Sequence, residues 1–240
     1  MEAKICVAIS TRNRPLEFAK TYAKWREHLP LNASLVVVDD ASDNIYFDAD
    51  FRFNERAGIP KVKNKCLDLA VEMEADHIFL SDDDCYPISD DWYLPYVNSG
   101  INHLCYTFTG AYAYVGKRSN PVEKDGFMVH QLASGCMMYF TSKCIETVGG
   151  FNEQFGIGLY EHVEMNRRIF NAGLTPYRNM DIIGSNKLFH SMDEHNEVER
   201  SFTRAERKEL LASGGKIFHS TVQSKNYIEF RDAKIQNIRG

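Results

Sequence analysis

The sequence predicts an α/β fold with a mixed, mostly parallel sheet flanked by helices, in one domain that spans residues 1–240. Three apolar runs support this fold, and each ends in a polar or acidic turn: residues 4–9, 35–38 and 78–80. Strand, helix, strand, helix, strand within roughly 80 residues is the pattern of parallel strands joined by right-handed crossovers.

The two helices between these strands have recognisable starts. Pro15 suits the first turn of a helix that we expect to reach about Leu29. A second helix follows Pro60, because apolar residues recur on a broad face from Val62 to Met73.

The rest of the chain alternates shorter elements. Further strands are expected at residues 104–108, 112–115, 135–140 and 182–183. Further helices are expected from a Ser89 cap, from a Thr141 cap to Gly149, over 161–172, and over about 203–212, before Gly214 and Gly215. Residues 116–126 are expected to form a polar loop, and a polar turn is expected to carry His190.

Composition narrows the class of protein. With 44% hydrophobic and 25% charged residues, the chain is ordinary for a soluble globular protein. It has no apolar run of about 18 residues, so no membrane span is expected, and its first residues lack the pattern of a secretion signal. A net charge of −5 and sparse basic residues indicate no clear nucleic-acid patch. Six scattered cysteines without a C-x-x-C pair indicate free thiols and a cytoplasmic location.

Three successive carboxylates follow the third strand, at residues 82–84. They repel one another, so gathering them at a strand end calls for a cation, and oxygen-rich sites suit Mg²⁺ or Mn²⁺. A solvated acidic turn is the alternative. If the strands are parallel, this turn shares one sheet edge with Thr11-Arg12 and Asp39-Asp40, where a nucleotide would sit. The chain has neither a dinucleotide fingerprint nor a P-loop, so we expect a metal on Asp82 and Asp84 to neutralise a diphosphate.

Several stretches together resemble a known family. Residues 7–15 (VAISTRNRP), 36–42 (VVVDDAS) and 78–84 (IFLSDDD) are similar to the nucleotide-binding half of family 2 glycosyltransferases of the GT-A fold. Residues 54–64 resemble the segment before the DXD motif of that family. Residues 134–140 and 148–155, followed by Glu161, resemble its acceptor half. The resemblance covers roughly residues 4 to 190, in the family's order.

The resemblance implies a nucleotide site. Asp40 would bond the base or ribose of a nucleotide sugar, and Thr11, Arg12 and Arg56 would line the pocket. The two arginines are equally compatible with surface charges.

It also implies a metal site. Asp82 and Asp84 would be the outer members of the DXD motif, with Asp84 on the metal and Asp82 nearer the ribose and the metal's waters. His190 stands where related enzymes place a third, histidine ligand, and imidazole favours Mn²⁺ over Mg²⁺. A lone histidine is more often structural, and His195 and His219 are the fallback candidates.

The catalytic group is expected at residues 161–162. Family 2 enzymes typically have Glu-Asp here, whereas this chain has Glu161-His162 and the run EHVE, which resembles ENLE of the polypeptide N-acetylgalactosaminyltransferases. Either side chain has suitable chemistry for a general base. We expect Glu161 to be the indispensable group and His162 to line the acceptor pocket, and the stereochemistry stays open.

The resemblance therefore implies a metal-dependent, hexosyltransferase-type glycosyltransferase that uses a UDP-sugar. Residues 1–100 would bind the nucleotide sugar, residues 101–200 would hold the acceptor and the catalytic group, and residues 201–240 would form a C-terminal helix and tail. The acceptor could be a glycan, a lipid-linked glycan, a protein or a modified nucleobase. One alternative is a non-catalytic sugar- or nucleotide-binding GT-A protein. Another is a sugar-1-phosphate nucleotidyltransferase, although residues 10–14 lack the glycines of its phosphate loop.

Overall fold

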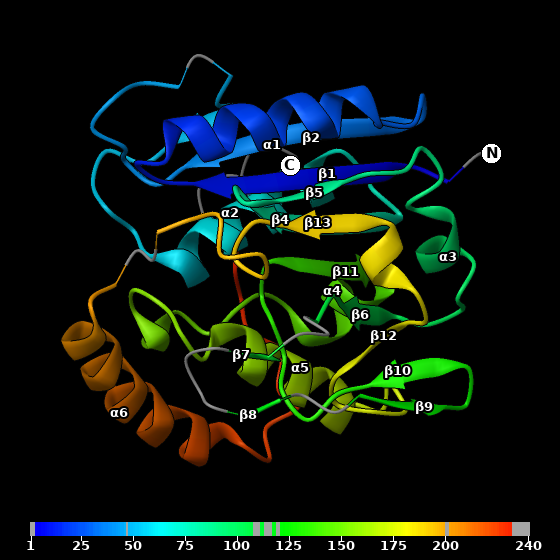
Figure 1. The fold of residues 1–240 in the computed structure, drawn as a ribbon. Helices are drawn as coiled ribbons and strands as arrows, with labels where there is room; N and C mark the ends of the chain where they lie inside the picture. The colour runs from blue at the N-terminus through cyan, green and yellow to red at the C-terminus, as the bar shows by residue number, and fades with distance from the viewer. Residues whose placement is uncertain are drawn as a thin grey trace, which may run out of the picture.

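A six-stranded mixed sheet forms the centre of the molecule (Figure 1). The computed structural model describes residues 3–46, 48–107, 111–112, 117–118, 121–199 and 202–231. In spatial order the strands are β3 (Phe51–Arg52), β2 (Ala33–Asp39), β1 (Ile5–Thr11), β4 (His77–Asp82), β11 (Met137–Thr141) and β6 (His103–Cys105). The first four are parallel, and β11 runs antiparallel to both of its neighbours. The predicted mixed, mostly parallel sheet is confirmed.

The register of the central strands aligns their polar ends. Thr11 at the end of β1 pairs with Asp39 of β2, and Ser10 pairs with Asp82 of β4. In Figure 1, β1 points toward the side of the molecule where the C-terminal helix α6 lies. The three polar turns therefore meet at that edge of the sheet, as expected for parallel strands.

Helices cover both faces of the sheet. Side chains of β1 alternate between two cores, with Ile5, Val7 and Ile9 in one and Cys6 and Ala8 in the other. Helix α1 contributes to the first core, and α2, α4 and α5 contribute to the second. The helices are α1 (Pro15–Glu27), α2 (Ile59–Glu72), α3 (Leu94–Val97), α4 (Ser142–Val148), α5 (Glu161–Asn171) and α6 (Arg204–Thr221), with short 3-10 turns η1 (Glu153–Phe155) and η2 (Ser185–Lys187).

Three small sheets surround the central one. They pair β12 (Met180–Ile182) with β10 (Phe127–Val129) and β9 (Val122–Lys124), β13 (Phe189–Ser191) with β5 (Cys85–Pro87), and β7 (Ala111–Tyr112) with β8 (Lys117–Arg118). The β5–β13 pair matters for the site, because it carries His190 next to the strand that follows the acidic turn. His190 lies in a strand and not in the turn that the sequence indicated.

The predicted loop over 116–126 is wrong in part. Strand β9 turns into β10 through Asp125 and Gly126, which both have positive φ (51° and 82°). An Asp-Gly pair is a strong hairpin signal, because such turns need positive φ at both central residues. The sequence analysis did not predict this hairpin, because all three residues of β9 are exposed and show no apolar pattern.

Two other elements differ from prediction. No helix begins at Ser89; α3 begins at Leu94, where Pro95 suits the first turn. The expected core strand at 182–183 is β12, which pairs in a small sheet and leaves Ile183 48% exposed. The expected strand at 112–115 lies mostly outside the described residues, as does the last residue of 104–108.

Helix α6 continues through Gly214 and Gly215, where the sequence indicated a stop. Gly214 lies against the Tyr160 ring, and a Cβ there would be 2.8 Å from Tyr160 Cδ2. Tyr160 in turn stacks on Phe218, with 5.6 Å between ring centres. The glycine thus permits close packing of α6 and does not end the helix.

All six cysteines lie in described parts of the chain, buried and without a disulfide, as predicted. Among the described helices, none has the length and apolar character needed to cross a membrane.

Candidate active site

Asp82 ends β4, and Asp83 and Asp84 form the turn that follows. The Asp82 side chain is 34% exposed, whereas the side chains of Asp83 and Asp84 are 5% and 10% exposed. Ser10 Oγ donates a hydrogen bond to Asp82 Oδ1 at 3.3 Å. Asp82 is therefore the most accessible of the three carboxylates.

Arg14 neutralises the two buried carboxylates. Its Nη1 lies 2.8 Å from Asp83 Oδ1, and its Nη2 lies 3.0 Å from Asp84 Oδ2. Thr11 Oγ1 donates a further hydrogen bond to Asp83 Oδ2 at 2.8 Å. Burial raises the pKa of both carboxyls above the usual range, and the charge of Arg14 opposes that rise. The segment after β1 thus holds the acidic turn, a role for Arg14 that the sequence did not reveal.

A cleft of about 570 Å³ opens at this edge of the sheet. Its volume is in the range of small-molecule and cofactor sites. The five residues predicted to bind nucleotide all line it: Thr11, Arg12, Asp40, Arg56 and Asp82. The fold therefore brings together side chains that are far apart in the sequence.

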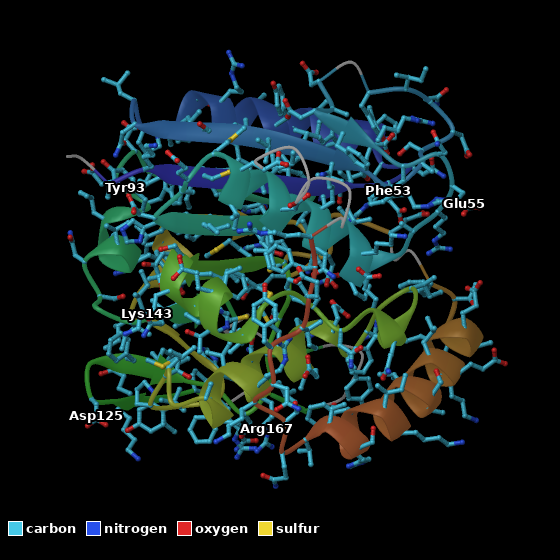
Figure 2. All side chains as sticks on the ribbon, turned by 180° about the vertical axis from the view of Figure 1, so that it is seen from behind. Phe53, Glu55, Tyr93, Asp125, Lys143 and Arg167 are labelled. Atoms are coloured by element: carbon cyan, nitrogen blue, oxygen red, sulfur yellow. The ribbon has the colours of Figure 1, made fainter. Side chains whose placement is uncertain are left out.

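The loop after β3 contributes Arg56 and Gly58 to one wall of the cleft. Figure 2 shows Phe53 and Glu55, at the start of this loop, on the side of the molecule where α6 lies. Asp40 holds the loop, because its carboxylate accepts hydrogen bonds from the backbone N–H groups of Ala57 and Gly58. Both of its oxygens are engaged by the backbone. Contact between Asp40 and a base or ribose stays a prediction. It requires the carboxylate oxygens to accept a hydrogen bond from the nucleotide in addition to those from Ala57 and Gly58.

Arg12 and Arg56 bring positive charge to the cleft. The Nε of Arg12 is buried and makes no hydrogen bond to any described residue. The Arg56 guanidinium lies 5.9 Å from the centre of the Phe202 ring, within cation–π range. Both arginines line the cleft, and Arg56 is also exposed to solvent, so nucleotide binding by either residue stays a prediction.

A buried lysine connects the cleft with the start of α5. Lys63 is 2% exposed, and its Nζ lies 2.8 Å from the Gly135 carbonyl, 3.3 Å from Asp82 Oδ1 and 3.9 Å from Glu161 Oε1. Burial alone would lower the pKa of this ammonium, but Asp82 and Glu161 raise it overall. Sequence reasoning missed this residue, although a charged side chain among the buried positions of α2 was a signal.

Glu161 and His162 contact each other. His162 Nδ1 lies 3.1 Å from Glu161 Oε1, while the buried Oε2 has no hydrogen-bond partner among the described residues. Burial alone would raise the Glu161 pKa, but His162, the hydrogen bond to it and Lys63 lower that pKa to about 2. Gly135 packs on the imidazole, since a Cβ there would be 3.0 Å from His162 Cγ. The pair is therefore tightly placed, with Glu161 ionised at neutral pH.

His190 lies apart from these groups. Its ring stacks on Tyr86 and on His195, with 5.0 Å and 4.3 Å between ring centres. Its Nε2 lies 3.1 Å from Glu197 Oε1. It does not line the cleft, so its predicted role as a third metal ligand stays a prediction, in which Nδ1 would be the ligand atom if Nε2 keeps its contact with Glu197.

The acidic turn provides oxygen donors that suit Mg²⁺ or Mn²⁺, in Asp82 and Asp84. Arg14 occupies one oxygen of Asp84. Within the described chain, no group of three or more His, Cys, Asp and Glu side chains is arranged to hold a metal. The residues therefore fit a metal that takes one or two carboxylates from the protein and its other ligands from substrate phosphates and water.

Sequence comparisons give a partial match to a glycosyltransferase. No protein-family model matches the chain. A curated relative, an uncharacterized glycosyltransferase of Acanthamoeba polyphaga mimivirus, is 28% identical over 163 residues, which are 60% of this chain and 62% of that protein. This chain thus matches less than two thirds of the relative's length.

Solved structures are similar over most of the chain. The mannosyltransferase PcManGT from Pyrobaculum calidifontis, in complex with GDP-Man and Mn²⁺, has a TM-score of 0.55 at 15% identity, covering 92% of this chain and 71% of that one. A variant of Drosophila β-1,4-galactosyltransferase 7, in complex with manganese, UDP-Gal and xylobiose, has a TM-score of 0.52 at 18% identity, covering 86% and 79%. Residues 1–349 of TarS from S. aureus give a TM-score of 0.55 at 12% identity, covering 90% and 72%. The chain therefore has the GT-A glycosyltransferase fold, as its sequence predicted.

Proposed function

We propose that this protein is a metal-dependent glycosyltransferase that moves a hexose from a nucleotide-diphosphate sugar, a UDP-sugar, to an acceptor hydroxyl. The observation that carries the proposal is the cleft at the carboxyl edge of the sheet, which gathers Thr11, Arg12, Arg56 and Asp82 in a chain of GT-A fold. The glycosyltransferase relative and the solved neighbours that hold nucleotide sugars support it.

The donor would lie in the cleft with its diphosphate between the arginines and the acidic turn. Arg12 and Arg56 offer positive charge to the phosphates, and the buried Arg12 Nε has a donor to spare. A Mn²⁺ or Mg²⁺ ion held by Asp82 and Asp84 would supply charge stabilisation for the leaving nucleoside diphosphate. His190 is the candidate for a third ligand.

Glu161 and His162 would form the catalytic pair. Glu161 Oε1 would accept a hydrogen bond from His162 Nδ1, and in that tautomer the Nε2 of the ring would be the atom that takes a proton. The Glu161 side chain is 4% exposed and its Oε1 faces both His162 and Lys63, whereas the His162 side chain is 17% exposed and so better placed to reach an acceptor. We therefore assign proton transfer from the acceptor hydroxyl to His162 and orientation of its ring to Glu161. The sequence alone favoured Glu161.

The acceptor belongs to one of four classes: a glycan, a lipid-linked glycan, a protein side chain or a modified nucleobase.

The six buried cysteine thiols suit the reducing cytoplasm as the compartment of this protein. The likeness of residues 161–164 to the polypeptide N-acetylgalactosaminyltransferases, which retain the anomeric configuration, would favour retention, whereas direct activation of the acceptor by His162 would favour inversion.

A donor screen tests the proposal. UDP- and GDP-sugars are first ranked by thermal shift with Mn²⁺, and hydrolysis of the best ligands is then followed by release of the nucleoside diphosphate. We expect stabilisation by a UDP-sugar that depends on Mn²⁺, and slow hydrolysis that chelation abolishes. Binding without hydrolysis would favour a non-catalytic binding protein, and no stabilisation by any nucleotide sugar would contradict the proposal.

A further inference from the structure

Lys63 lies between the two carboxylates on which the proposed function depends. Its Nζ is 3.3 Å from Asp82, which faces the donor cleft, and 3.9 Å from Glu161, which holds His162. The third neighbour of the ammonium is the carbonyl of Gly135, at 2.8 Å, and Gly135 packs on the His162 ring. One buried side chain thus contacts Asp82 in the donor cleft and two groups that contact His162, namely Glu161 and Gly135.

Packing alone does not account for a lysine here. Its neighbours on the buried face of α2, Val62, Cys66 and Leu67, belong to an apolar core. Burying an ammonium in such surroundings is costly unless charges and hydrogen bonds compensate, and apolar side chains often fill buried ion-pair positions without loss of stability. The three contacts of Lys63 supply that compensation and fix three groups relative to one another.

The fixed groups form a continuous series from Asp82 through Lys63 and Glu161 to His162. Glu161 Oε1 faces both Lys63 and His162, so the position of that oxygen sets the direction of the imidazole. Without the ammonium, Glu161 Oε1 would lose one of the two side chains that it faces and could turn in its buried site.

We propose that Lys63 is a positioning residue of the transfer reaction, which fixes Glu161, and through it the His162 ring, relative to the donor carboxylate Asp82. This inference rests on the proposed function. It differs from a donor-binding role because Lys63 does not line the cleft.

The first test compares Lys63→Met and Lys63→Arg with a matched control. Lys65→Met removes another lysine of α2, whose Nζ lies 2.7 Å from the buried Asp68 and contacts none of the four residues above. Binding is measured by calorimetry with UDP and Mn²⁺, and turnover with the UDP-sugar that the wild type hydrolyses fastest. We expect Lys63→Met to lower kcat about 10–100-fold, as is typical for groups that orient a catalytic residue, with UDP affinity changed less than about threefold. Lys63→Arg should recover part of kcat, and Lys65→Met should keep it.

A double-mutant cycle separates positioning from general destabilisation. If Lys63 acts through Glu161, Lys63→Met should cost less than about threefold in kcat when Glu161→Gln is already present. The double variant also removes one charge of each sign, so it serves as the folded reference if Lys63→Met alone does not fold. An equal cost in both backgrounds, or a loss of UDP affinity that parallels kcat, would overturn the inference.

A readout that needs no turnover decides the case independently of the proposed function. The His162 ring signal in proton NMR, assigned with His162→Asn, should shift in Lys63→Arg and Lys63→Met in the same sense as in Glu161→Gln, and stay in place in Lys65→Met. An unchanged ring signal in the Lys63 variants would refute the positioning role. Absence of hydrolysis by the wild type would instead refute the proposed function.

Discussion

The guanidinium of Arg14 lies 3.0 Å from the carboxylate of Asp84, although 70 residues separate them in the chain. Both side chains are largely buried, at 20% and 10% exposure. The positive charge that the acidic turn needs is therefore supplied, in part, by the chain itself. A metal that binds at Asp84 would share this carboxylate with Arg14, so stability and metal binding are connected at this turn.

The first prediction concerns this ion pair. Arg14→Met should lower the free energy of unfolding by about 3–5 kcal/mol, because it leaves Asp83 and Asp84 buried and unpaired. Urea denaturation at pH 7 measures the loss. Lys4→Met is the control, because it breaks an exposed pair with Glu74 that has the same 2.8 Å length as the pair between Arg14 and Asp83, and it should cost much less. Equal losses of unfolding free energy in the two variants would contradict the claim that the buried Arg14 pair stabilises the protein more than an exposed ion pair does.

The second prediction concerns pH. The Glu161 pKa is lowered to about 2, so Glu161 stays ionised throughout the neutral range and cannot cause an acid limb of the rate profile. If His162 is the base, the acid side of the rate profile should depend on this imidazole and should change in the His162→Asn variant. His162→Asn should abolish most turnover, and Glu161→Gln should weaken it by removing the hydrogen bond to the ring. Proton NMR of the product should show inversion at the anomeric carbon.

The outcome that contradicts this assignment is equally specific. If His162→Asn keeps near-normal turnover while Glu161→Gln loses it, glutamate is the essential group, and retention becomes the expected stereochemistry.

Glu161 should also make the stability of the protein depend on pH in a definite direction. A lowered carboxyl pKa contributes stability above its ordinary value of 4.5, and this stability is lost as the pH falls toward 2. Glu161→Gln should lack that loss in acid denaturation.

The third prediction concerns His190. If it completes a metal shell, His190→Ala should weaken Mn²⁺ binding in the presence of UDP about 10–100-fold, with the fold retained. His195→Ala tests the fallback ligand: if His190 is the third ligand, His195→Ala removes only a ring stacked on it and should leave Mn²⁺ affinity nearly unchanged. Equal Mn²⁺ affinity of His190→Ala and the wild type would leave His190 with the stacking role and the Glu197 contact that the structure shows.

Much of the fold could be predicted because it depends on local pattern. The strands at residues 5–11, 33–39 and 77–82 each contain at least three consecutive buried apolar residues, and Pro15 marks the start of the first helix. The hairpin at Asp125 was missed because each of its strands has only three residues and the first strand is fully exposed. The length of α6 was missed because Gly214 packs against Tyr160, which is far away in the sequence. Local periodicity carries no information on such contacts.

The site shows the same division. Polar residues at the ends of parallel strands were expected to meet, and Thr11, Asp40 and Asp82 do line one cleft. The partners of these residues were not predictable. The sequence analysis gave Arg14 and Lys63 no separate role, whereas the fold places one on Asp84 and the other between Asp82 and Glu161. Contacts such as Arg14 with Asp84 and Lys63 with Glu161 depend on tertiary packing, which brings together residues far apart in the sequence.

The central claim is that the cleft binds a nucleoside diphosphate through a metal at the acidic turn. Calorimetry of UDP binding, with Mn²⁺ and with chelator, to the wild type and to Asp84→Ala tests it most directly. We predict that wild-type binding requires Mn²⁺ and that Asp84→Ala loses the Mn²⁺-dependent part, while both proteins unfold cooperatively. Unchanged UDP affinity in Asp84→Ala, or wild-type binding that is indifferent to chelator, would contradict the claim.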